Sequence, residues 1–201
     1  MTTKIKASIS KGNTKMGKVP SFSTMPGKTC SKLACRTCLK ECYAMKAVRK
    51  YKETRNAYTR NTRLALDHRE ELFSQLGTFL ARKNPEFFRF HVAGDIPDQD
   101  YLDRMYQIAR DNPDTSFLAF TKRYYLTYAK RPKNMTIVFS AWPGVKFHRK
   151  RGIPVAWMVD KAGVEQRHLN RNVIWCPGHC ETCGMCWALP QLGLDVCFPQ
   201  H

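Results

Sequence analysis

The chain has 201 residues, and 43% of them are hydrophobic, which is enough for one sizeable core and too many for a disordered protein. It contains no run of about 18 apolar residues and no apolar leader, so we expect a cytoplasmic protein without a membrane span. The formal net charge is +18, and residues 1–63 hold 16 Lys or Arg against only Glu41 and Glu53. Such a one-sided positive charge favours nucleic acid or an acidic protein as the partner.

The first third of the chain is basic and holds the first group of cysteines. Residues 1–29 form a basic N-terminal arm, and residues 30–42 form a first cysteine loop with a turn of helix. From 44 to 81 the apolar spacing is helical, and we expect one helix or two. The exposed face of its first part carries the candidate nucleic-acid ligands Lys46, Arg49, Lys50, Lys52 and Arg55.

Residues 44–175 form the predicted α/β core of a single domain. Asp98 is a plausible N-cap for a helix, and a short helix is expected at 124–129. Five apolar runs predict strands at 87–93, 116–120, 135–140, 154–159 and 172–175. The alternation predicts either a partial TIM-like barrel or an open parallel sheet of about five strands, with the cysteine loops at both chain ends.

Ligands of such folds bind beyond the carboxyl ends of the strands. Asp95 and Lys122 follow two of the predicted strands, so they are candidate catalytic residues at this rim. A role of Asp95 in the turn or helix entry is at least as plausible from the sequence.

Residues 176–197 form the second cysteine loop, with Cys176, Cys180, Cys183 and Cys186 inside eleven residues. This spacing lets several thiolates converge, as a soft metal or an iron–sulfur cluster requires. The first loop provides four more thiols, and the cytoplasm keeps thiols reduced, which argues against disulfides. The first-loop ligands are Cys30, Cys35, Cys38 and Cys42.

Three arrangements of these eight cysteines remain open. Each group can hold one [4Fe–4S] cluster, one group can hold zinc instead, or the groups can share fewer ions. Cys176, Cys180 and Cys183 also have the C-x3-C-x2-C spacing of radical-SAM enzymes. Cys186 would close the iron that S-adenosylmethionine needs, so we do not expect that cofactor. Trp175 and Trp187 flank the run and are predicted to shield it from water.

Several short motifs together resemble a phage protein family. They are Lys11–Met16, Pro26–Cys30, Cys42–Ala44, Val92–Asp95, Phe120–Lys122 and Cys183–Trp187. In this order they resemble the "gene product 88" family of bacteriophages and prophages, whose members look like compact relatives of radical-SAM barrels. The resemblance implies a viral protein in a bacterial cytoplasm and metal ligation by the clustered cysteines; it supplies no substrate.

Three hypotheses about function follow. The first is a redox-sensing or regulatory iron–sulfur protein whose basic N-terminal third binds nucleic acid or a host protein. The second is a radical-SAM-like or other redox enzyme that modifies nucleic acid. The third is a zinc-stapled binding protein with no redox role.

Overall fold

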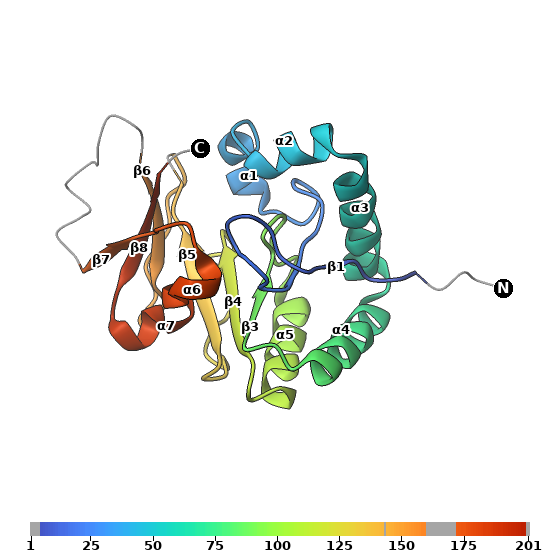
Figure 1. Ribbon diagram of the computed structural model, residues 1–201. Coiled ribbons are helices and arrows are strands. Elements are labelled where there is room, and N and C mark those ends of the chain that lie inside the picture. Colours follow the sequence, from blue (N-terminus) through green and yellow to red (C-terminus); the bar gives the residue numbers. More distant parts are fainter. Residues whose placement is uncertain (1–4, 143, 160–171, 200–201) are drawn as a thin grey trace.

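The protein is described by a computed structural model that covers residues 5–142, 144–159 and 172–199 (Figure 1). Eight strands form one sheet in the order β1-β2-β3-β4-β5-β6-β8-β7. Their bounds are Ile9–Ser10 (β1), Ser21–Phe22 (β2), Phe87–Phe90 (β3), Ser116–Thr121 (β4), Met135–Ser140 (β5), Val155–Val159 (β6), Val173–Trp175 (β7) and Asp195–Pro199 (β8). All neighbouring pairs are parallel except β1 with β2.

The sheet is open, with β1 and β7 at its two edges. The α/β class and the parallel sheet are therefore confirmed, and the structure does not support the barrel alternative. The predicted count of about five strands is too low. The five predicted strands are present as β3 to β7, and the additional ones are β1, β2 and β8. Two of these contain only two residues each, too short for an alternation of apolar and polar residues to be visible in the sequence.

The helices surround the sheet. Their bounds are Lys32–Cys38 (α1), Tyr43–Lys50 (α2), Lys52–Asp67 (α3), Arg69–Lys83 (α4), Gln99–Asp111 (α5), Cys180–Cys183 (α6) and Met185–Leu192 (α7). The predicted helical stretch 44–81 is three helices, because the backbone leaves the helical region at Tyr51 and His68. Neither break is marked by Gly or Pro. As predicted, Asp98 caps α5, and its carboxylate accepts a hydrogen bond from the Tyr101 backbone N–H at 3.0 Å.

The two faces of the sheet carry different cores. Phe88, Phe90 and Phe117 belong to the larger core, which is covered by α3, α4 and α5. Leu118, Val138 and Val196 belong to a smaller core on the opposite face, which is covered by α7 and the N-terminal segment. Figure 1 shows α6 and α7 in front of the sheet, on the side away from α5. The C-terminal cysteines therefore lie on the face with the smaller core.

The N-terminal segment is part of the sheet and touches the C-terminal cysteines. Asn13 and Gly17 form a tight hairpin, and its Lys15 carbonyl accepts a hydrogen bond from the Cys180 N–H at 2.9 Å. Gly17 has a φ of 61°, and a Cβ there would lie 2.0 Å from Glu181 Oε2. Residues 13–18, the N-terminal hairpin, therefore need glycine at position 17 to lie against α6.

The short helix predicted at 124–129 is wrong. Tyr124, Leu126 and Tyr128 are buried, whereas Tyr125 and Thr127 are exposed, so the burial alternates with a period of two. The segment consists of turns, such as the one closed by the Leu126 N–H and the Arg123 carbonyl at 3.2 Å, and the Tyr124 hydroxyl ties it to β5 by donating to the Ser140 carbonyl at 2.6 Å. In the described part of the chain, no helix is both long and apolar enough to span a bilayer.

Candidate metal centres and basic surface

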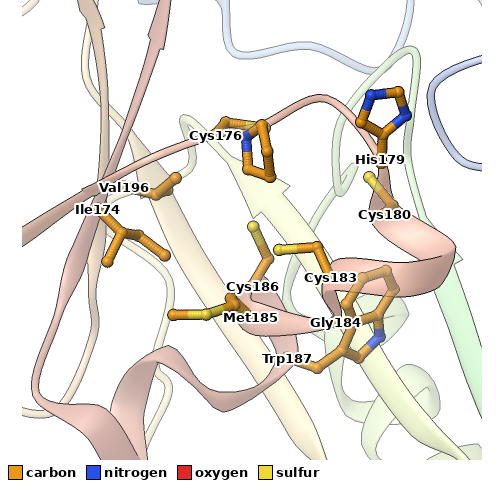
Figure 2. A pocket seen from close by; sticks show the side chains of 11 residues that line it. Ile174, Cys176, His179, Cys180, Cys183, Gly184, Met185, Cys186, Trp187 and Val196 are labelled. Carbon is orange, nitrogen blue, oxygen red and sulfur yellow. The ribbon is translucent and has the colours of Figure 1, made fainter.

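The four C-terminal cysteines line one small pocket on the face with the smaller core. Cys176 follows β7, and its N–H donates to the Cys197 carbonyl at 2.9 Å. Cys180 and Cys183 begin and end α6, and Gly184, with a φ of 60°, turns the chain so that Cys186 returns to the pocket. His179, Met185 and Trp187 complete much of the lining (Figure 2). The spacing in the sequence thus brings the four thiols to one place.

Burial makes two of these thiols, Cys180 and Cys186, hard to ionise. It is the main cause that raises the pKa of Cys186 to about 12, and it also raises the pKa of Cys180. The neighbouring cysteines of the same group add to both shifts, whereas the positive charge of Arg89 opposes them. A bound cation would stabilise the thiolate forms, because metal binding displaces thiol protons.

The side chains nevertheless lack the arrangement of a closed metal site. Among the described residues, no three His, Cys, Asp or Glu side chains converge closely enough to hold a metal ion. Figure 2 shows the sulfur atoms of Cys183 and Cys186 turned toward the same space. The donor set is that of a soft metal or an iron–sulfur cluster, and it fits such a group by its chemistry and its shared pocket.

The two tryptophans that flank the C-terminal run differ in position. Trp187 is buried, and its backbone carbonyl accepts a hydrogen bond from Thr136 Oγ1 at 2.6 Å, which ties α7 to β5. Trp175 is 55% exposed and does not line the pocket. The predicted shielding of the cysteines by Trp175 is therefore wrong, and Trp187 alone contributes it.

The N-terminal cysteines lie at the carboxyl ends of β3 and β4. Cys35 and Cys38 are on α1, and Cys42 is the N-cap residue of α2. Burial raises the pKa of Cys30 to about 12, and Asp95, Cys35 and Cys42 add to this shift. The thiols that contribute to the shifts of Cys30 and Cys38 belong to the same group, and no cysteine of this group lines the pocket of the C-terminal cysteines. The two cysteine groups thus lie apart, which argues against the shared arrangement.

Asp95 and Lys122, the two rim candidates, have different roles. The Asp95 carboxylate is buried and accepts hydrogen bonds from Thr121 Oγ1 at 2.6 Å, from the Lys122 N–H and from the Ile96 N–H. Burial still raises its pKa, against the effect of these donors. Because both Asp95 oxygens accept hydrogen bonds from neighbouring residues, the carboxylate ties the loop after β3 to the end of β4.

The Lys122 ammonium group lies beside the N-terminal cysteines. Its Nζ donates to Ser140 Oγ at 2.9 Å and lies 5.3 Å from the centre of the Trp142 ring. Burial raises the pKa of the Cys38 thiol, and the charge and hydrogen bond of Lys122 oppose that shift. The two candidates therefore act in opposite directions: Lys122 opposes the rise in the pKa of Cys38, whereas Asp95 adds to the rise in the pKa of Cys30.

Comparison with known proteins assigns the family. The profile described as "Gene product 88" matches residues 2–189. The chain belongs to the gene product 88 family. It is 27% identical over 179 residues to the "Gene 88 protein" of Mycobacterium phage L5, and the alignment covers 74% of each chain. No solved structure matches the chain significantly. These findings establish a phage protein family, whereas the relation to radical-SAM barrels stays a hypothesis.

The basic residues proposed as nucleic-acid ligands lie next to the N-terminal cysteine group. Lys46, Arg49, Lys50, Lys52 and Arg55 are all exposed, on α2 and the first turn of α3. The same helices contribute Ala44, Val48 and Leu64 to buried positions. All five residues are exposed, as the sequence predicts, and the first of them, Lys46, lies about one helical turn after Cys42.

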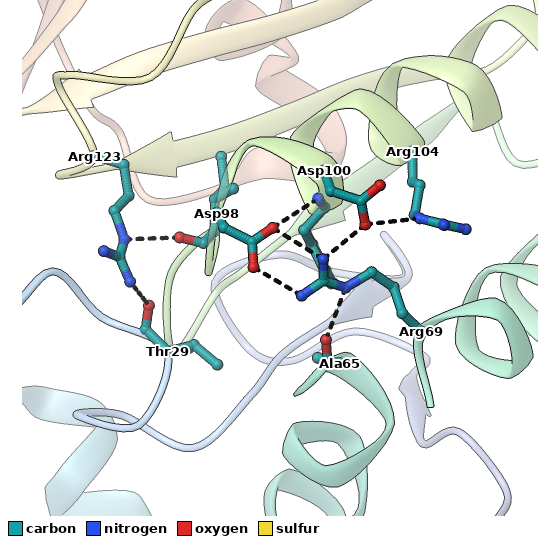
Figure 3. Close-up of polar contacts among 9 residues, drawn as sticks. Thr29, Ala65, Arg69, Asp98, Asp100, Arg104 and Arg123 are labelled. Carbon is teal, nitrogen blue, oxygen red and sulfur yellow. Dashed lines mark hydrogen bonds and ion pairs between the residues drawn. The ribbon is translucent and has the colours of Figure 1, made fainter. Parts of the chain in front are cut away.

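Sequence reasoning missed a second arginine-rich feature. Arg69 pairs with Asp98 at 2.8 Å and with Asp100 at 2.7 Å, which ties α4 to the start of α5 (Figure 3). Arg123, a candidate for anion binding by its position after β4, instead donates to the carbonyls of Ile96 and Thr29. Nothing in the sequence separates such structural arginines from Arg89, which faces the C-terminal cysteines.

Proposed function

We propose that the protein binds iron–sulfur clusters, one at each cysteine group, and that it senses redox state or metal supply. The observation that carries this proposal is the C-terminal pocket, which is lined by the half-buried cysteines Cys176, Cys180, Cys183 and Cys186. Burial raises the pKa of two of these thiols, Cys180 and Cys186, and a metal centre would displace their protons. A bound cluster would supply one-electron transfer.

The N-terminal cysteine segment supports a second metal site. Among residues 30–42 whose side chains are described, none belongs to either hydrophobic core. The segment is held by polar contacts, such as that of the Gly27 N–H with Cys30 Sγ at 3.3 Å. Small units without an apolar core are commonly fixed by metal–thiolate bonds. A metal at this group would therefore hold α1 and the start of α2 in place.

Nucleic acid is the partner that we propose for the basic face of α2 and α3. The face presents five exposed Lys or Arg side chains, and Tyr51 is exposed between them. Cations that neutralise phosphates provide affinity without sequence preference, and an aromatic ring can stack on a base. Because Cys42 is the N-cap residue of α2, the state of the N-terminal cysteine group would influence this surface.

An enzyme is the second candidate, and one observation favours it. Lys122 lies beside Cys38 at the carboxyl ends of the parallel strands, where α/β proteins bind their ligands. In such an enzyme Lys122 would bind an anionic group of a substrate next to the cysteine site.

Metal analysis tests the proposal directly. Iron, acid-labile sulfide and zinc are measured in anaerobically purified wild type, Cys186→Ser, Cys38→Ser and Cys197→Ala. We expect iron with equimolar sulfide in the wild type and about half of it in each of the two serine variants. Cys197 lies outside both groups, so Cys197→Ala should keep the full content. Zinc without sulfide would reject the redox function and leave a structural site; absence of both metals would reject the proposal.

The nucleic-acid interface is tested by salt dependence. The double variant Lys46→Gln, Lys50→Gln should bind duplex DNA more weakly and reduce the slope of log affinity against log salt by about two. The matched control removes Arg82 and Lys83, two exposed cations at the end of α4. Equal slopes for the two double variants would show that α2 is not the contact surface.

A further inference from the structure

Arg89 is a half-buried arginine on the sheet face that holds the C-terminal cysteines. Its guanidinium carbon lies 4.7 Å from the centre of the Phe120 ring, and its NH1 lies 4.0 Å from the Met16 sulfur. Its Nε is buried and has no hydrogen-bond partner. None of the ion pairs in the described part of the chain involves Arg89. Its positive charge is therefore not balanced by a carboxylate partner.

Such an arrangement is unfavourable by itself. A guanidinium group loses hydration when it is covered, and a nearby negative charge normally compensates for that loss. The Phe120 ring compensates only in part. Among the described residues, Arg89 therefore has no carboxylate that offsets the loss of hydration of its charge.

The C-terminal cysteines are the groups that face Arg89. Phe87 lies two residues before Arg89 on β3, and therefore on the same face of the sheet, and its ring packs against Trp187 of the pocket with 4.7 Å between the ring centres. The contacts give the same placement: Met16, which Arg89 touches, follows Lys15, whose carbonyl holds the Cys180 N–H. Cys180, Cys186 and Phe120 all pack against the smaller core. Arg89 and the pocket thus share one side of the sheet.

We propose that Arg89 is the charge partner of an anionic metal–thiolate centre in the C-terminal cysteine pocket. This inference rests on the proposed function, because it requires that the pocket binds a metal. Four thiolates around a divalent ion or a cluster leave a net negative charge, which a fixed cation stabilises. The delocalised charge of arginine can stack on Phe120 and still face sulfur, which a lysine ammonium group does less well. Arg89 would then increase the affinity of the pocket for the metal, and its charge would not stabilise the metal-free protein.

The test uses Co²⁺, whose thiolate absorption reports binding whatever the native metal is. Full-length protein with Cys38→Ser, which removes a ligand of the N-terminal group, is titrated anaerobically with Co²⁺ alone. In this background Arg89→Gln should raise the dissociation constant at least tenfold, and Arg89→Met, which keeps the length of the side chain over Phe120, should do the same. Arg89→Lys should raise the dissociation constant for Co²⁺ by a smaller factor. The control Arg82→Gln, at an exposed arginine, should leave this constant unchanged.

The melting temperature of the metal-free variants separates a charge partner from a structural residue. Removal of an unbalanced cation should leave that temperature unchanged or raise it, while metal affinity falls. Unchanged Co²⁺ affinity in Arg89→Gln and Arg89→Met would overturn the inference, as would an equal loss in Arg89→Lys. If the Cys38→Ser background binds no Co²⁺ at all, the inference and the metal site at this pocket both fail. If it binds tightly and Arg89 has no effect, only the inference fails.

Discussion

The carboxylate of Asp195 anchors the part of the sheet from which the C-terminal cysteine pocket extends. It is buried at the start of β8 and accepts hydrogen bonds from Arg149 at 2.7 and 2.8 Å, from the Val155 N–H at 2.8 Å and from Trp157 Nε1 at 2.9 Å. These contacts join β6 to β8, and β8 in turn pairs with β7, which leads into Cys176. Asp195→Asn removes the charge and half of the acceptors.

The loss of unfolding free energy in Asp195→Asn follows from the burial and the charge of the Asp195 carboxylate. Breaking a buried ion pair by removing one partner costs about 3–5 kcal/mol, and we expect the lower end, because the Arg149 side chain is 34% exposed and regains some hydration. For a chain of this size, about 3 kcal/mol lowers the melting temperature by roughly 6–12 °C. Denaturant unfolding at pH 7, followed by tryptophan fluorescence, measures the loss.

The same carboxylate gives the loss a pH dependence. Burial favours the protonated form of Asp195, but the hydrogen bonds from Arg149, Trp157 and Val155 outweigh it, so the pKa of Asp195 lies below its ordinary value. Its stabilisation is therefore complete above the unfolded-state pKa of about 3.9 and disappears as pH falls through the folded-state pKa. The difference between wild type and Asp195→Asn should persist at neutral pH and shrink in acid.

The matched control is Asp114→Asn, at an exposed aspartate, which should unfold like wild type at every pH. A loss below about 1 kcal/mol for Asp195→Asn would place it among ordinary surface pairs and refute the reasoning. So would a loss of the same size at all pH values, because the carboxylate charge would then not be its cause.

Two further predictions concern the N-terminal segment. Gly17→Ala forces a side chain into the left-handed region and against Glu181, so we expect about 1–3 kcal/mol of destabilisation and weaker metal retention at the C-terminal group, measured by chelator competition. Gly77→Ala, at a helix position with open space, is the control and should not lower stability. Asn61 is buried and bonds to the Ser8 N–H and to the carbonyls of Ser8 and Ser23, so Asn61→Ala should cost about 1–3 kcal/mol and speed proteolysis before residue 23. Unchanged cleavage would show that other contacts hold this segment.

The larger features of the fold could be predicted because they repeat along the chain. The apolar runs of β4 and β5 and the cap at Asp98 are local signals, and the structure confirms each of them. The strands β1 and β2 could not be predicted, because each pairs only two residues and owes its place to contacts with distant partners such as β3. The helix predicted at 124–129 is absent, because the buried side chains Tyr124, Leu126 and Tyr128 recur at every second residue, which is not the spacing of a helix.

The candidate sites divide in the same way. The spacing of the cysteines was sufficient to predict both groups, because residues that are close in sequence are also close in space. The placement of Arg89 beside Cys180 and Cys186 depends on the twist of a sheet and on a hairpin more than 70 positions away in the chain. The hydrogen bonds to the Asp95 carboxylate could not be predicted from the sequence either, because two of the three donors come from Thr121 in β4 and from the next residue, Lys122.

The order of the last three strands also constrains how the molecule assembles. β8 follows β7 in the chain but lies between β6 and β7 in the sheet. β7 therefore joins the rest of the sheet only through β8, and the position of Cys176 depends on that pairing. A chain in which β8 has not yet paired would leave the thiols of this group apart and open to oxidation. We therefore expect the yield of loaded protein to depend on how much metal is present while the chain folds, rather than on metal added afterwards.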